Sequence, residues 1–188
     1  MRTAYIGMGA NLGSAAGPPE ATLAAAVRRL GSLGRVTARS RLYSTAPVGV
    51  TEQPRFVNAA VALATELEAR DLLAGLLAIE RAFGRNRAIE VRNGPRTLDL
   101  DILLFGDEIV HEAELEIPHP RLFERAFALI PLDEIAPDLR DPNTGNTVKE
   151  WLQRLVPGFD DANSSVLAFE SDVWRRGADR DVSTGRQP

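Results

Sequence analysis

The sequence of 188 residues contains no cysteine, which excludes disulfides, zinc-thiolate sites, iron–sulfur clusters and thiol nucleophiles. It also has no apolar run near the roughly 20 residues that a membrane-spanning helix needs. The net charge of −4 and the aromatic content of 6% provide no general attraction for nucleic acid and few rings for an RNA-binding sheet. We therefore expect a cytoplasmic protein whose partners are small molecules, with no nucleic-acid or membrane partner. A monomer is expected as well, although composition does not determine the oligomeric state.

The glycine-rich N-terminus lacks the familiar nucleotide-binding loops. "GMGANLG" at residues 7–13 does not have the glycine spacing of a dinucleotide fingerprint, and the sequence has no G-x-x-x-x-G-K-[ST] phosphate loop. Two successive strands are expected after the first helix, which opposes a doubly wound parallel sheet. A nucleotide, if bound, is held by another kind of site.

Hydrophobic periodicity predicts the order β-α-β-β-α-β over the first 105 residues. The expected elements are a strand from residue 3, a helix in 18–34, strands in 35–45 and 55–67, a helix in 68–85 and a strand in 95–106. This order favours an α+β fold, a ferredoxin-like sandwich whose antiparallel sheet carries two helices on one face.

The C-terminal part is expected to add smaller elements to this sandwich. These are a hairpin in 107–118, a helix from about Pro120 to Ile135 and a short helix in 147–155. Residues 177–188 are polar and without periodicity, which is typical of disorder. We therefore predict a domain at 1–159 and a partly disordered tail at 160–188.

Two carboxylates, Asp99 and Asp101, lie two residues apart in the last predicted strand, so both point to the same face of the sheet. The opposite face is expected to carry Leu98, Leu100 and Ile102, and the aspartate face to continue with Leu103 and Phe105. Neighbouring carboxylates repel unless a cation lies between them, and Mg²⁺ favours one or two carboxylates with phosphate oxygens. The alternative is a solvated pair on an edge strand.

Arginines precede this strand in the loop that leads to it, at positions 85, 87, 92 and 96. The guanidinium group stays charged and makes bidentate contacts with phosphate. Carboxylates for metal beside arginines for phosphate are what phosphoryl transfer requires. The alternative is a set of surface arginines in weak ion pairs.

Three further polar side chains could take part in a site. Glu80 lies within the apolar stripe of its helix, so if buried it needs a partner: an arginine, the base of the cleft or a ligand. The alternative is that the stripe ends early and Glu80 reaches solvent. Asn58 shares a strand face with Phe56, which suits a flat heterocycle or a satisfied core amide. His119, close to Arg125, is either structural or a donor to phosphate or ribose.

The segment "RNGPRTLDLDIL" at residues 92–103 resembles the signature of the 6-hydroxymethyl-7,8-dihydropterin pyrophosphokinase family. Supporting segments are "YIGMGANLG", "YSTAPVG", "QPRFVNAAV", "IERAFGR" and "IPHPRLFERAFALIPLDEIAP", which together extend over about residues 3–155. The resemblance implies an enzyme that transfers diphosphate from ATP to the hydroxymethyl group of the pterin and releases AMP, a step of folate biosynthesis.

The resemblance also implies roles for individual residues. Asp99 and Asp101 match the ligands of two Mg²⁺ ions, and with Arg85 and Arg96 they form the catalytic set. The ATP-binding positions are Arg85, Arg87, Arg96, Ile102, His119 and Arg125, and the pterin-binding positions are Thr45, Val48, Phe56, Asn58 and Phe127. Phe56 and Phe127 match rings that sandwich the pterin, and Glu80 matches an active-site acid without an assigned role.

The loop "GRNRAIEVRNGPR" departs from the family pattern, because Asn93 stands where many relatives have a Trp that seals the site, and because the loop is one residue longer. Two rival functions remain at this stage. A ferredoxin-like module could bind a nucleotide or small ligand without turnover, but it would not need paired metal carboxylates. RNA binding on the sheet is disfavoured by the acidic balance.

Overall fold

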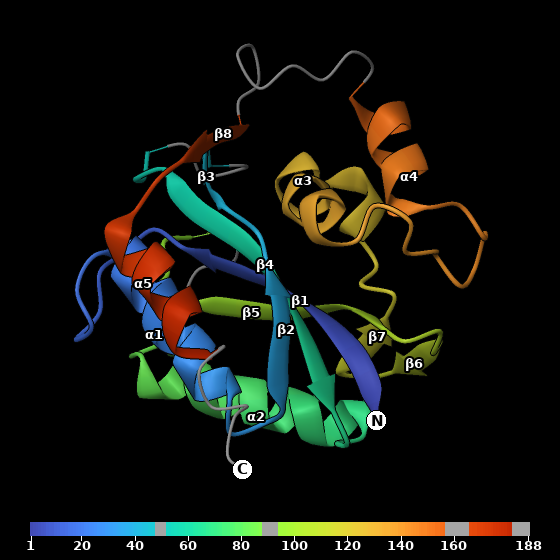
Figure 1. The fold of residues 1–188 in the computed structure, drawn as a ribbon, viewed down its shortest axis with the longest axis horizontal. Coiled ribbons are helices and arrows are strands. Elements are labelled where there is room, and N and C mark those ends of the chain that lie inside the picture. The colour runs from blue at the N-terminus through green and yellow to red at the C-terminus, as the bar shows by residue number, and fades with distance from the viewer. Residues whose placement is uncertain (48–51, 88–93, 157–165, 182–188) are drawn as a thin grey trace.

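The computed structural model describes residues 1–47, 52–87, 94–156 and 166–181, and within these ranges a six-stranded antiparallel sheet forms the centre (Figure 1). The strands are β1 (Arg2–Ala10), β2 (Arg35–Arg39), β3 (Leu42–Thr45), β4 (Phe56–Thr65), β5 (Asp99–Phe105) and β8 (Val166–Phe169). Their order is β5-β1-β4-β3-β8, with β2 also pairing with β4. The fold is therefore mixed, with an antiparallel sheet and several helices, as the α+β prediction required.

Helices cover both faces of this sheet (Figure 1). The helices are α1 (Pro19–Leu30), α2 (Ala69–Ala82), α3 (Ala126–Ile135), α4 (Val148–Leu155) and α5 (Asp172–Asp181), with a 3₁₀ turn, η1, at Leu122–Glu124. One hydrophobic core joins α1 and α2 to the sheet, and a second core joins η1, α3 and α4 to the other face. The predicted hairpin is formed by β6 (Val110–Glu112) and β7 (Leu115–Ile117).

Helix α2 follows its sequence pattern closely. Leu72, Leu76 and Ile79 are buried on the stripe that the 3.6-residue period predicts. The helix ends just before Gly84, whose φ of +86° is a left-handed conformation that glycine adopts without a Cβ clash. This ending places residues 85–87 beside the last strand of the predicted sandwich.

The predicted single strand at 35–45 is wrong, because the chain breaks at Ser40 into β2 and β3. The Ser40 hydroxyl accepts a hydrogen bond from the Ala60 N–H at 2.9 Å, and the Ser40 N–H donates to the Ala60 carbonyl at 2.9 Å. When a side-chain oxygen accepts a hydrogen bond that a backbone carbonyl of the strand would otherwise accept, the regular hydrogen bonding between the two strands is interrupted. The predicted helix from Pro120 is also divided, into η1 and α3.

A bulge in β5 overturns the expectation that Phe105 shares the aspartate face. Tyr5 pairs with Leu104 and Ile6 with Ile102, so Leu103 is an extra residue in the ladder. Leu103 packs in the core of α3 and α4, as predicted, whereas Phe105 packs in the core of α1 and α2.

Residues 166–181 form structure that the sequence pattern did not predict. Strand β8 pairs with β3, and α5 packs on α1 (Figure 1). The boundary predicted at residue 159 stays a prediction, although both elements lie against the preceding domain. No helix in the described ranges is long and apolar enough to cross a membrane.

Candidate active site

The site lies on the sheet face that also carries α3, and two glycines of β1 leave room for it. Gly7 is paired with Asp101 and Gly9 with Asp99, so both carboxylates stand beside residues without side chains. A Cβ on Gly9 would lie 3.0 Å from Oδ1 of Asn58, and one on Gly7 would lie 3.1 Å from Cδ2 of Leu103. Glycine therefore keeps the floor open between the two aspartates and Asn58.

A cavity of about 450 Å³ lies over this floor. Its walls include eleven of the residues singled out from the sequence: Thr45, Phe56, Asn58, Arg85, Arg87, Arg96, Asp99, Asp101, His119, Arg125 and Phe127. They come from β3, β4, β5, α3 and the loops between them. The fold thus brings together side chains that lie up to 82 positions apart in the sequence, from Thr45 to Phe127.

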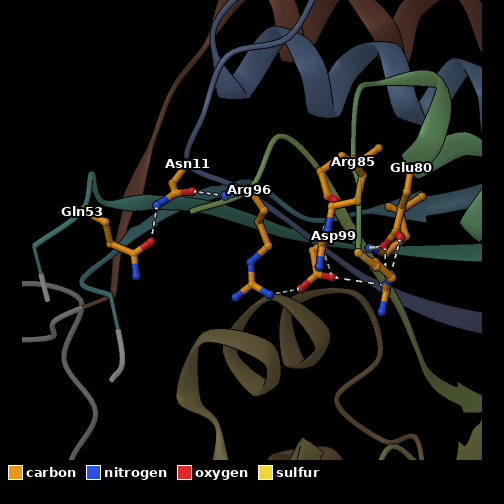
Figure 2. A network of polar contacts seen from close by, with 9 residues as sticks. Asn11, Gln53, Glu80, Arg85, Arg96 and Asp99 are labelled. Atoms are coloured by element: carbon orange, nitrogen blue, oxygen red, sulfur yellow. Dashed lines mark hydrogen bonds and ion pairs between the residues drawn. The ribbon is translucent and has the colours of Figure 1, made fainter. Parts of the chain in front are cut away.

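Asp99 lies at the centre of an arginine cluster (Figure 2). Its Oδ1 is 3.0 Å from Nη1 of Arg85 and 3.6 Å from Nη2 of Arg87, and its Oδ2 is 2.9 Å from Nη1 of Arg96. The Arg85 side chain is only 8% exposed and also donates to the Leu98 carbonyl at 2.6 Å. Water screens such partly buried pairs less than it screens surface pairs, so this cluster is held firmly.

Asp101 has a different environment from Asp99. Burial, and then the negative charge of Asp99, raise the pKa of Asp101 to about 7, although Arg87 opposes the increase. No ion pair of Asp101 is found among the described residues comparable to those of Asp99. Asp101 is therefore the carboxylate of the pair that would gain most from an added cation.

Glu80 has the partner that its position in the apolar stripe required. It is 1% exposed, and its carboxylate accepts from Arg87 through Nε at 2.9 Å and Nη2 at 2.8 Å. The same carboxylate accepts the Leu100 N–H at 2.8 Å, on the edge of the sheet formed by β5. Glu80 does not line the cavity, so it acts by fixing Arg87 and the strand that carries both aspartates.

The other end of the cavity has aromatic rings with polar groups beside them. Phe56 is paired with Thr45 across the sheet, and Nδ2 of Asn58 donates to the Thr45 hydroxyl at 2.7 Å. Guanidinium groups lie near the rings, with Cζ of Arg96 5.0 Å from the centre of Phe56 and Cζ of Arg125 5.5 Å from that of Phe127. Two rings and an orienting amide suit a flat heterocycle.

His119 is another residue of the cavity wall. Its Nδ1 accepts the Arg121 N–H at 3.1 Å, so in the neutral ring Nε2 carries the proton and can donate. Burial, and then the charge of Arg125, lower the pKa of His119 below its ordinary value. The neutral donor form is thereby favoured at pH 7.

Sequence reasoning missed Asn11, which links the two ends of the site (Figure 2). Its Oδ1 accepts the Arg96 N–H at 2.7 Å, and its Nδ2 donates to Oε1 of Gln53 at 2.9 Å and to the Pro54 carbonyl at 3.0 Å. Asn11 is 4% exposed, and the only signal in the sequence was an amide directly after a predicted strand. It joins the loop before Phe56 to the loop that carries Arg96.

Among the predicted site residues that the structure describes, Ile102 and Glu80 are not in the cavity wall. The Ile102 side chain is 4% exposed and packs in the core of α1 and α2, so only its backbone could reach ATP. Val48, predicted for pterin binding, and Asn93, in the predicted closing loop, both lie outside the described residues.

The donor set fits magnesium better than zinc or a transition metal. The described residues hold no cluster of three or more His, Cys, Asp or Glu side chains that would form an all-protein metal site. Two carboxylates on one strand face, beside arginines that can take phosphate, match the preference of Mg²⁺ for few protein ligands and substrate oxygens. Carboxylates and arginines at one end and aromatic rings at the other define a phosphoryl transferase with a flat co-substrate.

Comparisons with known proteins agree with this class. Residues 5–137 match the model of the 7,8-dihydro-6-hydroxymethylpterin-pyrophosphokinase (HPPK) family, and the chain belongs to that family. It is 47% identical over 159 residues to 2-amino-4-hydroxy-6-hydroxymethyldihydropteridine pyrophosphokinase of Methylorubrum extorquens, covering 84% of this chain and 96% of the relative. For the enzyme of the same name from Pseudomonas aeruginosa, the identity is 47% over 150 residues, covering 79% and 88%.

Solved structures support the fold. A crystal structure of Plasmodium falciparum HPPK-DHPS superposes with a TM-score of 0.65 at 15% sequence identity. The superposition covers 82% of this chain and 45% of that longer chain.

Proposed function

We propose that the aspartate pair and the arginines around it carry out the reaction of the family. The protein transfers diphosphate from ATP to the hydroxymethyl group of 6-hydroxymethyl-7,8-dihydropterin, giving AMP and the pterin diphosphate. This is a step of folate synthesis, the process named in matching proteins of Arabidopsis thaliana and Pneumocystis carinii. The observation that carries the residue assignment is the placement of Asp99 and Asp101 on one face, in a cavity wall that they share with arginines and with Phe56 and Phe127.

Asp99 and Asp101 would hold Mg²⁺, which neutralises phosphate charge and orients the oxygens of the triphosphate. This chain presents the two carboxylates on a rigid strand, with β1 glycines opposite them. The raised pKa of Asp101 means that a bound cation also stabilises its charged form. A rigid strand suits a site whose task is positioning.

Arg85 and Arg96 would exchange partners when the substrates bind. Both arginines are ion-paired with Asp99, whose charge a metal ion would take over. Their guanidinium groups would then contact the phosphate oxygens in bidentate fashion. Arg87, held by Glu80, and Arg125 and His119, on the opposite wall, would complete the ATP contacts.

At the other end, Phe56 and Phe127 would stack on the pterin while Asn58 and Thr45 hydrogen-bond to its edge. The pterin hydroxyl would then face the phosphate end across Gly9, where no side chain intervenes. Its oxygen forms a bond to the β-phosphorus and loses its proton to solvent, as the bond from that phosphorus to the α,β-bridging oxygen breaks and the electron pair leaves with AMP. Holding both reactants in line is the main contribution of the protein.

The finer features of the proposal follow the family pattern. Two Mg²⁺ ions per site, a monomeric chain, a cytoplasmic location and a catalytic domain at residues 1–159 stay predictions. A ferredoxin-like arrangement is supported by the strand order β5-β1-β4 followed by β2 and β3, and by α1 and α2 packing on one face.

The decisive assay incubates the protein with Mg-ATP and the hydroxymethyl dihydropterin and identifies the nucleotide product. Formation of AMP that depends on the pterin supports diphosphate transfer, whereas ADP would show transfer of a single phosphate. A protein that binds both ligands without making AMP would be the rival binding module.

The metal assignment is tested with Asp101→Ala. Loss of a positioned metal ligand should reduce turnover by at least about two to three orders of magnitude, corresponding to about 3–4 kcal/mol of transition-state stabilisation. Turnover close to that of the wild type would refute the role of Asp101 as a metal ligand.

A further inference from the structure

Strand β8 adds a residue to the cavity from a part of the chain that the family model does not match. The model ends at residue 137, whereas Val166 is among the residues that line the cavity. Val166 is 3% exposed and packs in the core of α3 and α4. The question is therefore whether this wall acts on a substrate and, if so, on which one.

The register of the sheet places Val166 at the pterin end. Val166 pairs with Thr45, which in turn pairs with Phe56, so the three residues form one cross-strand row. Paired residues of antiparallel strands point to the same face. The next row on the same face contains Ala168, Tyr43, Asn58, Gly9 and Asp99, and it runs from β8 to the aspartate strand.

Helix α5 holds β8 in this place. Trp174 is 5% exposed, and its Nε1 donates to the Ser40 carbonyl at 2.9 Å, at the break between β2 and β3. Cζ of Arg39 lies 4.9 Å from the centre of a Trp174 ring, and Nη2 of Arg39 donates to the Arg175 carbonyl at 3.1 Å. Strand β3, which carries Thr45, and strand β8, which carries Val166, are thus tied together at the end of the pair that lies next to Ser40.

We propose that Val166 forms a wall of the pterin pocket and is a specificity-determining residue for the pterin, so that β8 supplies one side chain to this pocket and α5 positions the strand. The branched side chain limits the space next to Thr45, where the ring edge would be read. Asp99, Arg85 and Arg87 come from β5 and the loop after α2, so Val166 should affect ATP little. This inference rests on the proposed assignment of the aromatic end to the pterin.

The test compares Val166→Phe with Leu167→Phe in the full-length protein. Leu167 is the next residue of the same strand, is 43% exposed, pairs with Ser44 and does not line the cavity. For Val166→Phe we expect the KM for the pterin to rise by about tenfold or more, since overfilling a close-packed pocket excludes the ligand. The KM for ATP should stay within about twofold, and Leu167→Phe should leave both values unchanged.

Val166→Ala provides a second measurement if the larger side chain impairs folding. Removing two methyl groups from the wall should raise the KM for the pterin by about threefold to tenfold without changing the KM for ATP. Equal effects of the Val166 and Leu167 variants, or equal changes in both KM values, would overturn the proposal. Wild-type AMP formation is measured in the same assay, so failure of the proposed function would be seen separately.

Discussion

The two aspartates should affect stability in opposite directions, although they lie two residues apart. Asp101→Asn removes a carboxylate whose pKa is raised from the ordinary 3.8 to about 7 by burial and by the charge of Asp99. This difference corresponds to about 4 kcal/mol at most, and solvent in the open cavity reduces it. We therefore expect Asp101→Asn to unfold with a free energy about 1–3 kcal/mol higher than that of the wild type at pH 8.

The sign of the pH dependence follows from the direction of the shift. Because the folded-state pKa of Asp101 lies above the unfolded-state value, the charge costs nothing well below pH 4, and its cost increases until the pH exceeds about 7. The stability gap between Asp101→Asn and the wild type should therefore widen from pH 5 to pH 8. Asp99→Asn should instead lose about 1–3 kcal/mol, since Arg85 and Arg96 lose their ion pairs.

Urea denaturation at pH 5 and pH 8, with EDTA to remove divalent cations, measures these differences. Both variants should lose pyrophosphokinase activity. For Asp101→Asn, the free energy of unfolding should therefore increase while the activity decreases. A gap that stays constant between the two pH values would refute the reasoning about Asp101. Stabilisation by Asp99→Asn would show that its arginine pairs contribute little.

Four further variants test other parts of the structure. Phe56→Ala should weaken pterin binding by about fivefold or more while ATP binding is retained, because stacking is worth about 1 kcal/mol beyond buried area; calorimetric titrations showing equal losses would contradict the division of the cavity. Asn11→Ala should lower kcat/KM for both substrates by about tenfold or more, since two loops lose a common link; a change for one substrate alone would contradict that link. Thr147→Ala removes the capping box of α4 and should cost about 0.5–2 kcal/mol in urea unfolding with kcat unchanged; an unchanged unfolding midpoint would contradict it. Trp174→Ala should cost about 3–5 kcal/mol, as for other buried aromatic truncations; a loss under 1 kcal/mol would show that α5 does not stabilise the domain.

The sequence was sufficient where a local period decides the structure. The alternation around Asp99 and Asp101 predicted their common face, and the stripe of α2 predicted that Glu80 must be buried with a partner. The choice of Arg87 and the Leu100 N–H as partners could not be predicted, because it depends on how α2 packs against β5.

The features that were missed depend on contacts between distant parts of the chain. The break at Ser40 needs Ala60 and Trp174, and Asn11 contacts Arg96, 85 positions away. The pairing of β8 with β3 also joins segments more than 100 positions apart. A period read along one segment contains no information about such partners.

The bulge at Leu103 makes the length of β5 as important as its composition. Its carbonyl accepts the His119 N–H at 2.9 Å, so the extra residue also holds the chain that brings His119 to the cavity. Deleting one residue here would make the pairing of β5 with β1 regular. It would also shift the chain after Phe105 by one residue relative to the two aspartates. We expect homologous chains to exchange apolar side chains of similar volume in this strand while keeping its number of residues constant.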